Sequence, residues 1–408
     1  MAGPLHGVVV LDLSRILAGP WATQVLADYG AEVLKVEHPQ GGDDTRKWGP
    51  PWLRDGAGRE TGESAYYLAT NRGKRSLAID FSKPEGQDLV RRLAVEADVL
   101  VENFKVGGLA RHGLGWDALS VLNPRLVYLS ISAFGQDGPD AAKPGYDAMI
   151  QATGGLMSVT GVPDGEPGAG PQKVGVAVAD LMCGMYAVSA ILAALHERAG
   201  SGLGQYIDLS LLDTQVAWLA NQNLNYLVSG VPPRRQGTAH PNIVPYQAFA
   251  TADGHLMLAV GNDAQFARFC AAAGDAALAD DPRYRTNSKR VAHRAELVPR
   301  VAALLGQRTT RHWLEALEAA QVPCGPINDL EQVFEEPQVR HRGLRFELPH
   351  ALGGTVPGVR NPVRYSRSAL DDGRAPPLLG ADTREILAKR LGLDHPTLDG
   401  LAARGVIA

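Results

Sequence analysis

Short apolar stretches alternate with longer amphipathic ones between residues 8 and 132, and this alternation constrains the fold more than any other feature of the chain. The short stretches have the length and composition of buried strands. They are Val8–Leu13, Ala31–Glu37, Leu77–Asp80, Asp98–Glu102 and Leu126–Ser132. A helix-like stretch, Pro20–Tyr29, joins the first two, which predicts a parallel strand pair with a right-handed crossover. Repetition of this pattern predicts an α/β fold with a doubly wound, Rossmann-like parallel sheet.

Ligands of such sheets bind at the carboxyl ends of the strands. The residues predicted to lie there are Leu17, Ala18, His38, Ile79 to Ser82, Asn103, Phe104 and the loop Lys143–Asp147. A nicotinamide-dependent dehydrogenase is one alternative, with Glu37 as the acid that binds the ribose. The first turn, Ser14–Pro20, holds one glycine where the dinucleotide fingerprint needs three, so this alternative is disfavoured.

The stretch Val174–Arg198 places a single acid where the hydrophobic spacing changes from two residues to about 3.6 residues. This pattern predicts an extended segment that runs into a helix, with Asp180 at the junction. The helix dipole and free backbone N–H groups are expected to keep the Asp180 carboxylate ionised. Asp180 is then either a simple helix N-cap or a reactive carboxylate. Gly184, one turn later, leaves room for a neighbouring backbone or a ligand.

The segment from residue 46 to residue 76 is loop-rich and carries several cations. They are Arg46, Lys47, Arg54, Arg72, Lys74 and Arg75. The pattern favours a solvated, charged loop over a cation cluster that binds a polyphosphate. The following segment, Ser82–Glu85, has the pattern of a capping box and predicts a helix that continues to about Glu96.

The chain of 408 residues has a net charge of −4, with 21% charged and 45% hydrophobic residues. These values argue against bulk binding to nucleic acid or to membrane surfaces. The apolar run Met185–Leu195 is shorter than a membrane span, and the N-terminal residues lack the basic region of a signal peptide, so a cytoplasmic protein is expected. Cys183, Cys270 and Cys324 are too few and too far apart for a disulfide framework or a metal site. Cys183 is expected to be a buried, inert thiol.

The length of the chain predicts more than one compact unit. Residues 1–200 are predicted to form the large α/β domain, 201–228 a linker helix and 229–330 a smaller α+β domain. Residues 331–408 are predicted to return to the large domain. The loop 237–246 carries His240, for which a structural role is favoured over binding of a substrate carboxylate.

Several motifs, taken in their order along the chain, resemble the class III CoA-transferases, the family of formyl-CoA transferase and carnitine CoA-transferase. The matching stretches are VLDLSRILAGPWATQVLADYGAEVLKVE, NRGKRSLAIDF, VENF with Arg111 downstream, GYDAMIQATGG, VAVADLMCGMYA, HPNIVPYQAF, QVPCGPINDL and APPLLGADTREIL. They run from about Leu11 to Leu387. Each motif is weak by itself, and their ordered set is specific.

The resemblance implies that Asp180 is the catalytic nucleophile, with an acyl-CoA and a free carboxylic acid as substrates and no metal. It implies CoA contacts at Leu17, Ala18, His38, Ile79, Ser82, Asn103, Phe104, Arg111, Lys143 and Tyr146. His38 stands where some family members carry arginine, so its contact with the nucleotide end of CoA is the least secure of these. The resemblance also implies an interlocked homodimer, in which each chain passes through a ring formed by the other.

The expected reaction is CoA transfer through an aspartyl anhydride and an aspartyl-CoA thioester. An acyl-CoA racemase on the same fold is an alternative. Racemases of the family show His-Asp in the stretch that here reads Gly145-Tyr146-Asp147, so Tyr146 replaces one of the two bases. A non-catalytic CoA-binding protein is a second alternative, and it requires an unreactive Asp180.

The acyl donor and acceptor are less closely specified by the sequence. Formyl-CoA transferases have a longer, glycine-rich loop where this chain has residues 237–246, which counts against a formyl or oxalyl specialist. Arginines in loops, such as Arg46, Arg72 and Arg234, could pair with the second carboxylate of a dicarboxylic acid. Succinyl-CoA with a small dicarboxylic acceptor is therefore the favoured pair.

Overall fold

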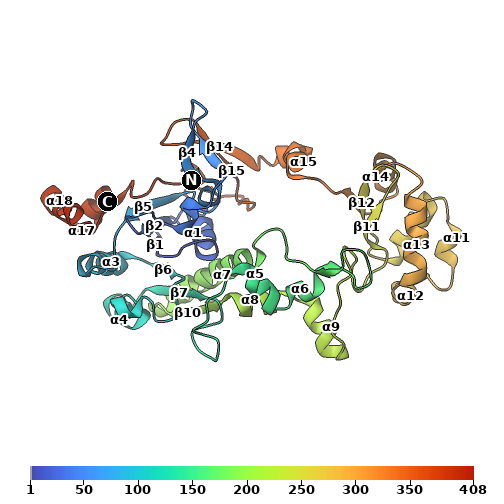
Figure 1. The fold of residues 1–408 in the computed structure, drawn as a ribbon, viewed down its shortest axis with the longest axis horizontal. Coiled ribbons are helices and arrows are strands. Elements are labelled where there is room, and N and C mark those ends of the chain that lie inside the picture. Colours follow the sequence, from blue (N-terminus) through green and yellow to red (C-terminus); the bar gives the residue numbers. More distant parts are fainter. Residues whose placement is uncertain (1) are drawn as a thin grey trace. The chain divides into compact units, whose positions relative to one another are not determined.

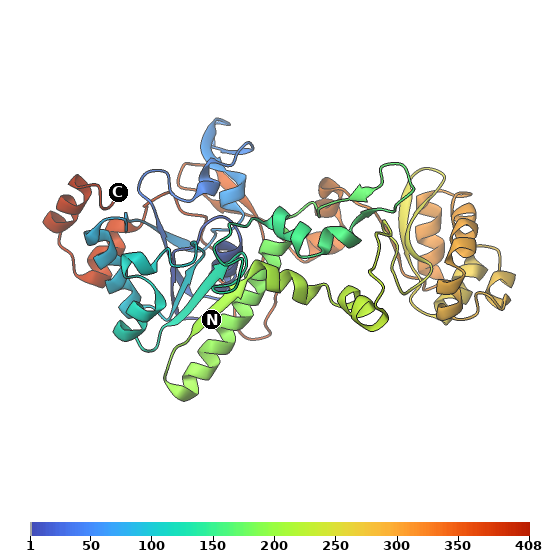
Figure 2. The ribbon, with the colours of Figure 1, turned by 60° about the horizontal axis from the view of Figure 1, so that its bottom comes forward.

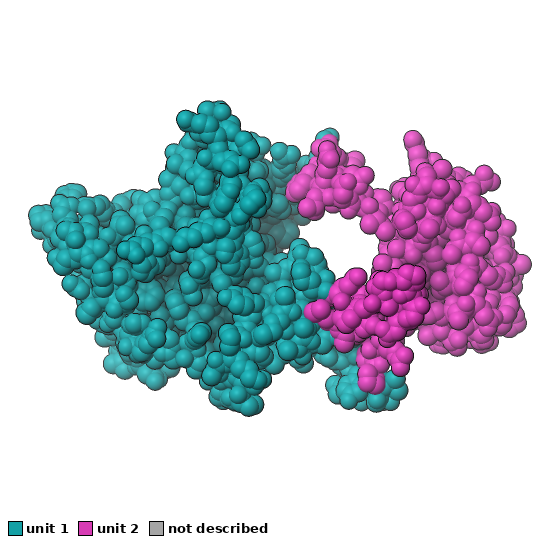
Figure 3. Space-filling view, in the orientation of Figure 1, with its two compact units in different colours: residues 1–156, 173–231, 340–408 teal, residues 157–172, 232–339 magenta. Residues whose placement is uncertain are grey.

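The computed structural model describes residues 2–408 and divides the chain into two compact units. The larger unit comprises residues 1–156, 173–231 and 340–408, and the smaller unit comprises residues 157–172 and 232–339 (Figure 3). These bounds differ from the predicted ones at four places. Residues 157–172 and 331–339 belong to the smaller unit, residues 201–228 belong to the larger unit rather than to a linker, and residues 229–231 belong to the larger unit rather than to the smaller domain.

A six-stranded, fully parallel sheet forms the centre of the larger unit (Figure 1). Its strands are β1 (Val9–Asp12), β2 (Glu32–Glu37), β5 (Lys74–Ala78), β6 (Val99–Glu102), β7 (Val127–Ser132) and β10 (Tyr206–Ser210). Their order across the sheet is β10-β7-β6-β1-β2-β5. This is the doubly wound, Rossmann-like order, and its direction reverses between β1 and β6, where such folds bind ligands. The predicted α/β fold is confirmed.

Strand β10 was not expected, because residues 201–228 were predicted to form a linker helix. Tyr206 to Ser210 instead pair in parallel with Tyr128 to Ser132 of β7. β10 is an edge strand that is only half buried along most of its length, so it lacks the continuous apolar run of the inner strands. Helices α8 (Leu211–Trp218) and α9 (Asn221–Ser229) follow it.

Helices cover both faces of the sheet (Figures 1 and 2). One face packs on α3 (Pro84–Glu96), α4 (Trp116–Leu122), α17 (Thr383–Leu391) and α18 (His395–Ala403). The other face packs on α1 (Ala18–Asp28), α5 (Asp147–Thr153) and α7 (Val178–Ser201). Inward-facing side chains of successive strand residues alternate between the two cores, as Val10 and Leu11 do in β1. The C-terminal segment thus completes one face of the sheet.

Helix α7 begins at Val178 and ends before Gly202, whose φ of +78° suits a glycine C-cap. Residues 174–177 are described and form no strand, so the predicted extended segment is wrong. By length and composition alone, α7 could cross a membrane, which corrects the prediction of a shorter apolar run. It packs against α1, α5 and α8 as a core helix of the larger unit.

Of the six cations named above for residues 46–76, Lys47 and Arg54 are exposed, as the prediction of a solvated loop requires, but Arg46, Arg72 and Lys74 are buried. Three of them form buried ion pairs with acids of the first strands and helix. The pairs are Arg46 with Glu37 at 2.7 Å, Arg72 with Asp28 at 2.8 Å, and Lys74 with Asp12 at 3.0 Å. For Arg46, Arg72 and Lys74, the predictions of a solvated loop and of a polyphosphate-binding cluster are therefore both wrong. Each of these cations instead neutralises a buried carboxylate of the same unit. Arg46 and Arg72 are accordingly not free to bind a dicarboxylate.

Smaller elements surround this core. The segment after β2 forms the 3₁₀ helix η1 (Asp44–Lys47), the hairpin of β3 (Trp52–Arg54) and β4 (Glu60–Ser64), and the short helix α2 (Ala65–Leu68). The 3₁₀ helix η2 (Ala110–His112) follows β6. Near the C-terminal end of the chain, β14 (Arg345–Pro349) pairs with β15 (Thr355–Val359). The predicted capping box at Ser82–Glu85 is wrong. Lys83 precedes α3, and the Ser82 hydroxyl donates instead to the Asp80 carboxylate at 2.6 Å.

The smaller unit has a three-stranded antiparallel sheet with helices around its own core. Its strands are β11 (Tyr246–Ala250), β12 (His255–Ala259) and β13 (Cys324–Pro326), and its helices are α10 (Asp263–Ala272), α11 (Ala277–Asp280), α12 (Asn287–Ala292), α13 (Arg294–Leu305), α14 (Thr310–Ala319) and α15 (Leu330–Glu335). The short elements α6 (Leu156–Val159), β8 (Gly161–Val162), β9 (Gly170–Pro171) and α16 (Pro337–His341) lie at its boundaries with the larger unit along the chain.

Candidate active site

A pocket of about 200 Å³ opens at the carboxyl ends of β1, β6 and β7, where the strand order reverses. Its lining includes Asp180 together with six of the ten predicted CoA contacts. The six are Leu17, Ala18, Asn103, Phe104, Lys143 and Tyr146. Residues far apart in the sequence thus meet at the position where a doubly wound sheet binds its ligand.

Asp180 lies in the first turn of α7 and is not the N-cap, which is Ala177. The Asp147 carboxylate accepts hydrogen bonds from the backbone N–H groups of Ala179 at 2.8 Å and Asp180 at 3.4 Å. The N–H group of Leu181 donates to the carbonyl of Ala177. The free N–H groups predicted to surround the Asp180 carboxylate are therefore already occupied, and the cap comes from a residue 33 positions upstream.

The pKa of Asp180 is raised to about 7 by burial and, secondarily, by the negative charge of Asp147. This overturns the prediction that the helix terminus would hold the carboxyl fully ionised. Burial disfavours the charged form of an acid, and a second carboxylate nearby adds to that cost. A carboxylate that has lost much of its hydration is also more reactive than a solvated one, so the site favours attack by Asp180 once it is ionised.

Asp147 is itself held in place by its own helix. The Gln151 side chain donates to Asp147 Oδ2 at 2.7 Å and accepts from the N–H of Val174 at 2.9 Å. This link ties α5, the start of α7 and the segment before it into one unit. The sequence placed Asp147 in a ligand-side loop and in a racemase-like motif, and missed its role as the cap of α7.

Gly184 and Cys183 complete the surroundings of the first turns of α7. A Cβ atom on Gly184 would lie 2.8 Å from the carbonyl oxygen of Ala18, so the glycine allows α1 and α7 to approach closely. The predicted close backbone approach is confirmed. Cys183 is fully buried, and burial raises the pKa of its thiol to about 12, as expected for an inert side chain.

Asn103 stabilises one wall of the pocket through both polar atoms of its side-chain amide. Its Oδ1 accepts from the backbone N–H of Arg15 at 2.8 Å, and its Nδ2 donates to the Arg15 carbonyl at 2.7 Å. Its neighbour Phe104 lies under the Arg15 guanidinium at 5.1 Å. The turn after β1 is thereby fixed to the turn after β6.

The other four predicted CoA contacts lie outside this pocket. His38 and Ser82 both lie beside the Asp80 carboxylate, at 3.7 Å and 2.6 Å. Ile79 is fully buried, so its side chain cannot contact a ligand at the surface. Arg111 is exposed and donates from Nε to His112 at 3.2 Å.

Aromatic contacts connect these residues to the pocket. The Phe81 ring packs edge-on against Phe104, with centroids 5.7 Å apart, and against His112 at 6.1 Å. Phe81 is adjacent to Ser82 in the chain, and His112 is adjacent to Arg111. The four outlying positions therefore extend from the pocket along the ends of β2, β5 and β6, which suits an elongated ligand.

Tyr66 does not line the pocket but lies within electrostatic range of it, which the sequence did not reveal. It lies in α2, within the loop-rich segment after β2. Burial, Asp180 and Asp147 raise its pKa to about 12, so its hydroxyl is a neutral group within electrostatic range of both carboxylates. The sequence holds no signal for this placement, because the long excursion after β2 has no periodic pattern.

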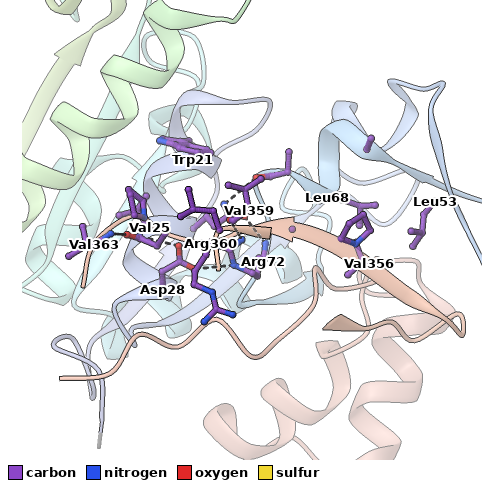
Figure 4. Close-up of a pocket in the computed structure, with 18 of the residues that line it drawn as sticks. Trp21, Val25, Asp28, Leu53, Leu68, Arg72, Val356, Val359, Arg360 and Val363 are labelled. Carbon is purple, nitrogen blue, oxygen red and sulfur yellow. Dashed lines mark hydrogen bonds and ion pairs between the residues drawn. The ribbon is translucent and has the colours of Figure 1, made fainter. Parts of the chain in front are cut away.

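A second cavity of the larger unit, of about 880 Å³, exceeds this pocket in volume (Figure 4). It is lined mainly by apolar groups of α1, β15 and the segment that follows β15, among them Trp21, Val25 and Val356. Its wall contains the ion pair between Asp28 and Arg72. Asp180 is not among the described residues that line it. The pocket of about 200 Å³ is the candidate active site because it holds Asp180 at the reversal point of the sheet.

His240 lies in the smaller unit. Its Nδ1 accepts from the Asn242 backbone N–H at 3.0 Å, and its ring packs against Tyr246 with centroids 5.3 Å apart. Burial and the charge of Arg294 lower its pKa. These contacts agree with a structural role and provide a neutral imidazole rather than a cation for a carboxylate.

Comparison with known proteins agrees with the geometry. Residues 5–383 match the model of CoA-transferase family III, and the chain belongs to this family. It is 53% identical over 386 residues to succinate–glutarate CoA-transferase of Agrobacterium fabrum, covering 95% of each chain. It is 43% identical over 404 residues to succinyl-CoA:glutarate CoA-transferase of Homo sapiens, covering 99% of this chain and 90% of that one.

A solved structure is similar throughout. The crystal structure of a CAIB/BAIF family protein from Brucella suis superposes with a TM-score of 0.83 at 47% identity, covering 96% of this chain and 100% of that chain. The protein is therefore a class III CoA-transferase that acts on acyl-CoA thioesters and free carboxylic acids. The dehydrogenase alternative is excluded by this assignment.

Proposed function

We propose that the enzyme transfers coenzyme A from succinyl-CoA to glutarate, with Asp180 as the covalent nucleophile. The observation that carries the proposal is the Asp180 carboxyl, which lies in the pocket at the reversal point of the sheet with its pKa raised to about 7. The names of the relatives from Agrobacterium fabrum and Homo sapiens supply the donor and acceptor.

The proposed reaction divides one exchange into four acyl transfers. An Asp180 oxygen attacks the succinyl thioester carbonyl, which breaks the C–S bond and gives a mixed anhydride and CoA thiolate. The thiolate attacks the aspartyl carbonyl and releases succinate, leaving an aspartyl-CoA thioester. Glutarate attacks this thioester and expels the thiolate, and the thiolate then attacks the glutaryl carbonyl. Glutaryl-CoA and the free Asp180 carboxylate result.

Oxyanions form at each of these steps and require hydrogen-bond donors. The start of α7 cannot supply them, because Asp147 and Ala177 already accept its first N–H groups. The start of α1 is the better source. Its first N–H groups, those of Ala18 and Gly19, have no partner within the helix. In the part of the chain that the structure describes, the side chain of the N-cap residue Leu17 does not cap them either. Leu17 and Ala18 line the pocket with Asp180.

A panel of acyl-CoAs and free acids tests the substrate assignment. With succinyl-CoA and glutarate, we expect glutaryl-CoA and succinate to form in equal amounts, measured by mass spectrometry. Acetyl-CoA with formate or oxalate is the control and should react much more slowly. A preference for monocarboxylic acids at both positions would contradict the proposed pair while leaving the class of reaction intact.

The racemase alternative requires a histidine that this chain lacks at the matching position. Tyr146 stands where a histidine would be needed, and its side chain is exposed. A tyrosine hydroxyl is a poor proton acceptor near neutral pH compared with an imidazole. The relatives named above are CoA-transferases rather than racemases. The other alternative, a non-catalytic CoA-binding protein, would leave the raised pKa of Asp180 without a function.

Arg111→Ala should raise KM for every acyl-CoA by a similar factor and change kcat little, because loss of a contact to the shared CoA moiety removes uniform binding. We propose that Arg111 binds the phosphate end of CoA, beyond Phe104 and Phe81. Arg384→Ala, which removes an exposed arginine of α17, is the matched control and should leave KM unchanged. A change in acid preference with unaltered CoA affinity would contradict this role.

We further propose that the enzyme is an interlocked homodimer, as the resemblance to the family implies. Helix α9 and the turn after it expose Leu224, Tyr226, Leu227, Val228 and Val231, an unusual number for a free surface. Buried polar atoms of Trp21 and Gln215 have no hydrogen-bond partner within residues 2–408. Sedimentation should give a dimer that persists at nanomolar dilution. A monomer at working concentration would contradict the proposal.

A further inference from the structure

The turn between β1 and α1 contains a strained residue beside the active site. Ile16 has a φ of +73°, in the left-handed region that a β-branched side chain rarely adopts. It lines the pocket that holds Asp180, and the helix whose N-terminus faces that pocket begins two residues later. Strain of this kind persists only where surrounding groups impose it.

The Asp43 carboxylate imposes this conformation. Both of its oxygens accept from the Ile16 N–H group, at 3.2 Å and 3.3 Å. Asp43 is 1% exposed, and the N–H and hydroxyl groups of Thr45 also donate to it. The fully buried Lys35 ammonium donates to Asp43 at 2.9 Å. This ion pair stabilises the ionised form of the Asp43 carboxyl, which accepts from the Ile16 N–H group.

The residues before Ile16 are held in the same way. Lys35 also donates to the Ser14 carbonyl at 2.9 Å, and Asn103 bonds both backbone groups of Arg15. Three consecutive residues of the turn are thus fastened to side chains from β2, from the Asp43 turn and from the end of β6. The residues that follow are the start of α1: Leu17 and Ala18 line the pocket, and the N–H groups of Ala18 and Gly19 have no partner within the helix.

We propose that Asp43 is a positioning residue for the transfer reaction, which holds Ile16 in its left-handed conformation and thereby aims the start of α1 at the substrate carbonyl beside Asp180. This inference rests on the proposed reaction at Asp180. It assigns a role in catalysis to an ion pair that lies outside the pocket and touches no substrate.

A double-mutant cycle with glycine at position 16 separates this role from a purely structural one. Asp43→Asn keeps the size of the side chain and removes its charge, and we expect kcat to fall about 100-fold with a smaller change in KM, as for a misplaced catalytic group. Glycine adopts a φ of +73° without strain. In the Ile16→Gly background the loss caused by Asp43→Asn should therefore be about ten times smaller.

The control is Gln321→Gly, since Gln321 is another non-glycine residue with positive φ, +54°, and lies in the smaller unit. It should not reduce the effect of Asp43→Asn. Hydrogen exchange, which needs no substrate, gives a second readout: Asp43→Asn should speed exchange in the peptide from residue 14 to residue 18 and leave β7 protected.

An equal loss in the wild-type and Ile16→Gly backgrounds, wild-type turnover of Asp43→Asn, or unchanged exchange at residues 14–18 would each overturn the proposal. If the wild-type enzyme instead prefers other acids, the proposed substrate pair fails, and the cycle can be measured with the preferred acyl-CoA. The two failures are therefore distinguishable.

Discussion

Asp180→Asn should lower CoA transfer by about 10,000-fold or more, because an amide cannot replace a carboxylate as the nucleophile. The fold should survive this change. Asparagine has nearly the same size, and the cap of α7 comes from Asp147 rather than from Asp180. Initial rates of glutaryl-CoA formation measure the effect, and the melting temperature checks the fold.

The same variant should be more stable than the wild type at pH 8. The pKa of Asp180 in the folded protein, about 7, lies above its ordinary value of 3.8. The folded state therefore binds the proton more tightly than the unfolded state. The stabilisation that this gives is present below about pH 4 and is lost as the pH rises through 7. Asparagine avoids this loss, so the free energy of unfolding at pH 8 should rise by about 1–3 kcal/mol.

Transfer activity in the wild type should correspondingly increase with pH through about 7, as the Asp180 carboxyl ionises. Asp147→Asn should move this apparent pKa downward, because the neighbouring negative charge is one of the causes of the raised value. A transfer rate of Asp180→Asn near that of the wild type would contradict the nucleophile assignment.

Arg72→Met should lower the free energy of unfolding by about 3–5 kcal/mol, because it leaves a buried carboxylate without its cation. Arg72 donates three hydrogen bonds to Asp28, from Nε at 3.1 Å and from Nη2 at 2.8 Å to each carboxylate oxygen. Both side chains are buried, at 7% and 2% exposure. Once Arg72 is removed, the Asn361 amide, at 3.2 Å, is the remaining hydrogen-bond partner that the described residues offer to the Asp28 side chain.

Arg54→Met is the matched control, from the same segment of the chain. Its partner Glu60 lies at 3.3 Å, but the two side chains are 64% and 55% exposed. An exposed pair of this kind contributes about 0–1 kcal/mol. Chemical denaturation of both variants at pH 5 and pH 8 would show the difference. The Arg72→Met defect should grow at pH 8, since burial already raises the pKa of Asp28 and the unpaired carboxyl must ionise as the pH rises. Equal defects in the two variants would contradict the assignment of Arg72 to a buried pair.

The parallel sheet could be predicted from the sequence because its inner strands are buried on both faces and carry continuous apolar runs. Strand β10 could not, since it lies at the edge with its side chains only partly buried. The ion pairs of Arg46, Arg72 and Lys74 were missed for a different reason. A charged residue carries no local signal of the distant carboxylate that pairs with it, so composition favoured a solvated loop.

The candidate active site could likewise be predicted only in part from the sequence. The change of hydrophobic spacing drew attention to Asp180, and the resemblance named six of the residues that line the pocket with it. The pKa of Asp180 is raised first by burial and then by the charge of Asp147, which lies far upstream in the chain and also accepts from the N–H groups that were expected to stabilise the Asp180 carboxylate. Tyr66 and the Asp43–Ile16 contact likewise depend on the path of the long excursion after β2.

Trapping the acyl-enzyme with hydroxylamine tests the central claim most directly. Hydroxylamine cleaves both an aspartyl anhydride and an aspartyl-CoA thioester, so wild-type enzyme incubated with succinyl-CoA and then with hydroxylamine should carry a hydroxamate at Asp180. Peptide mass spectrometry would locate the adduct in the peptide that contains the first turn of α7, and Asp180→Asn should give none. An adduct on another residue, or active wild-type enzyme that is never modified, would contradict covalent catalysis by Asp180.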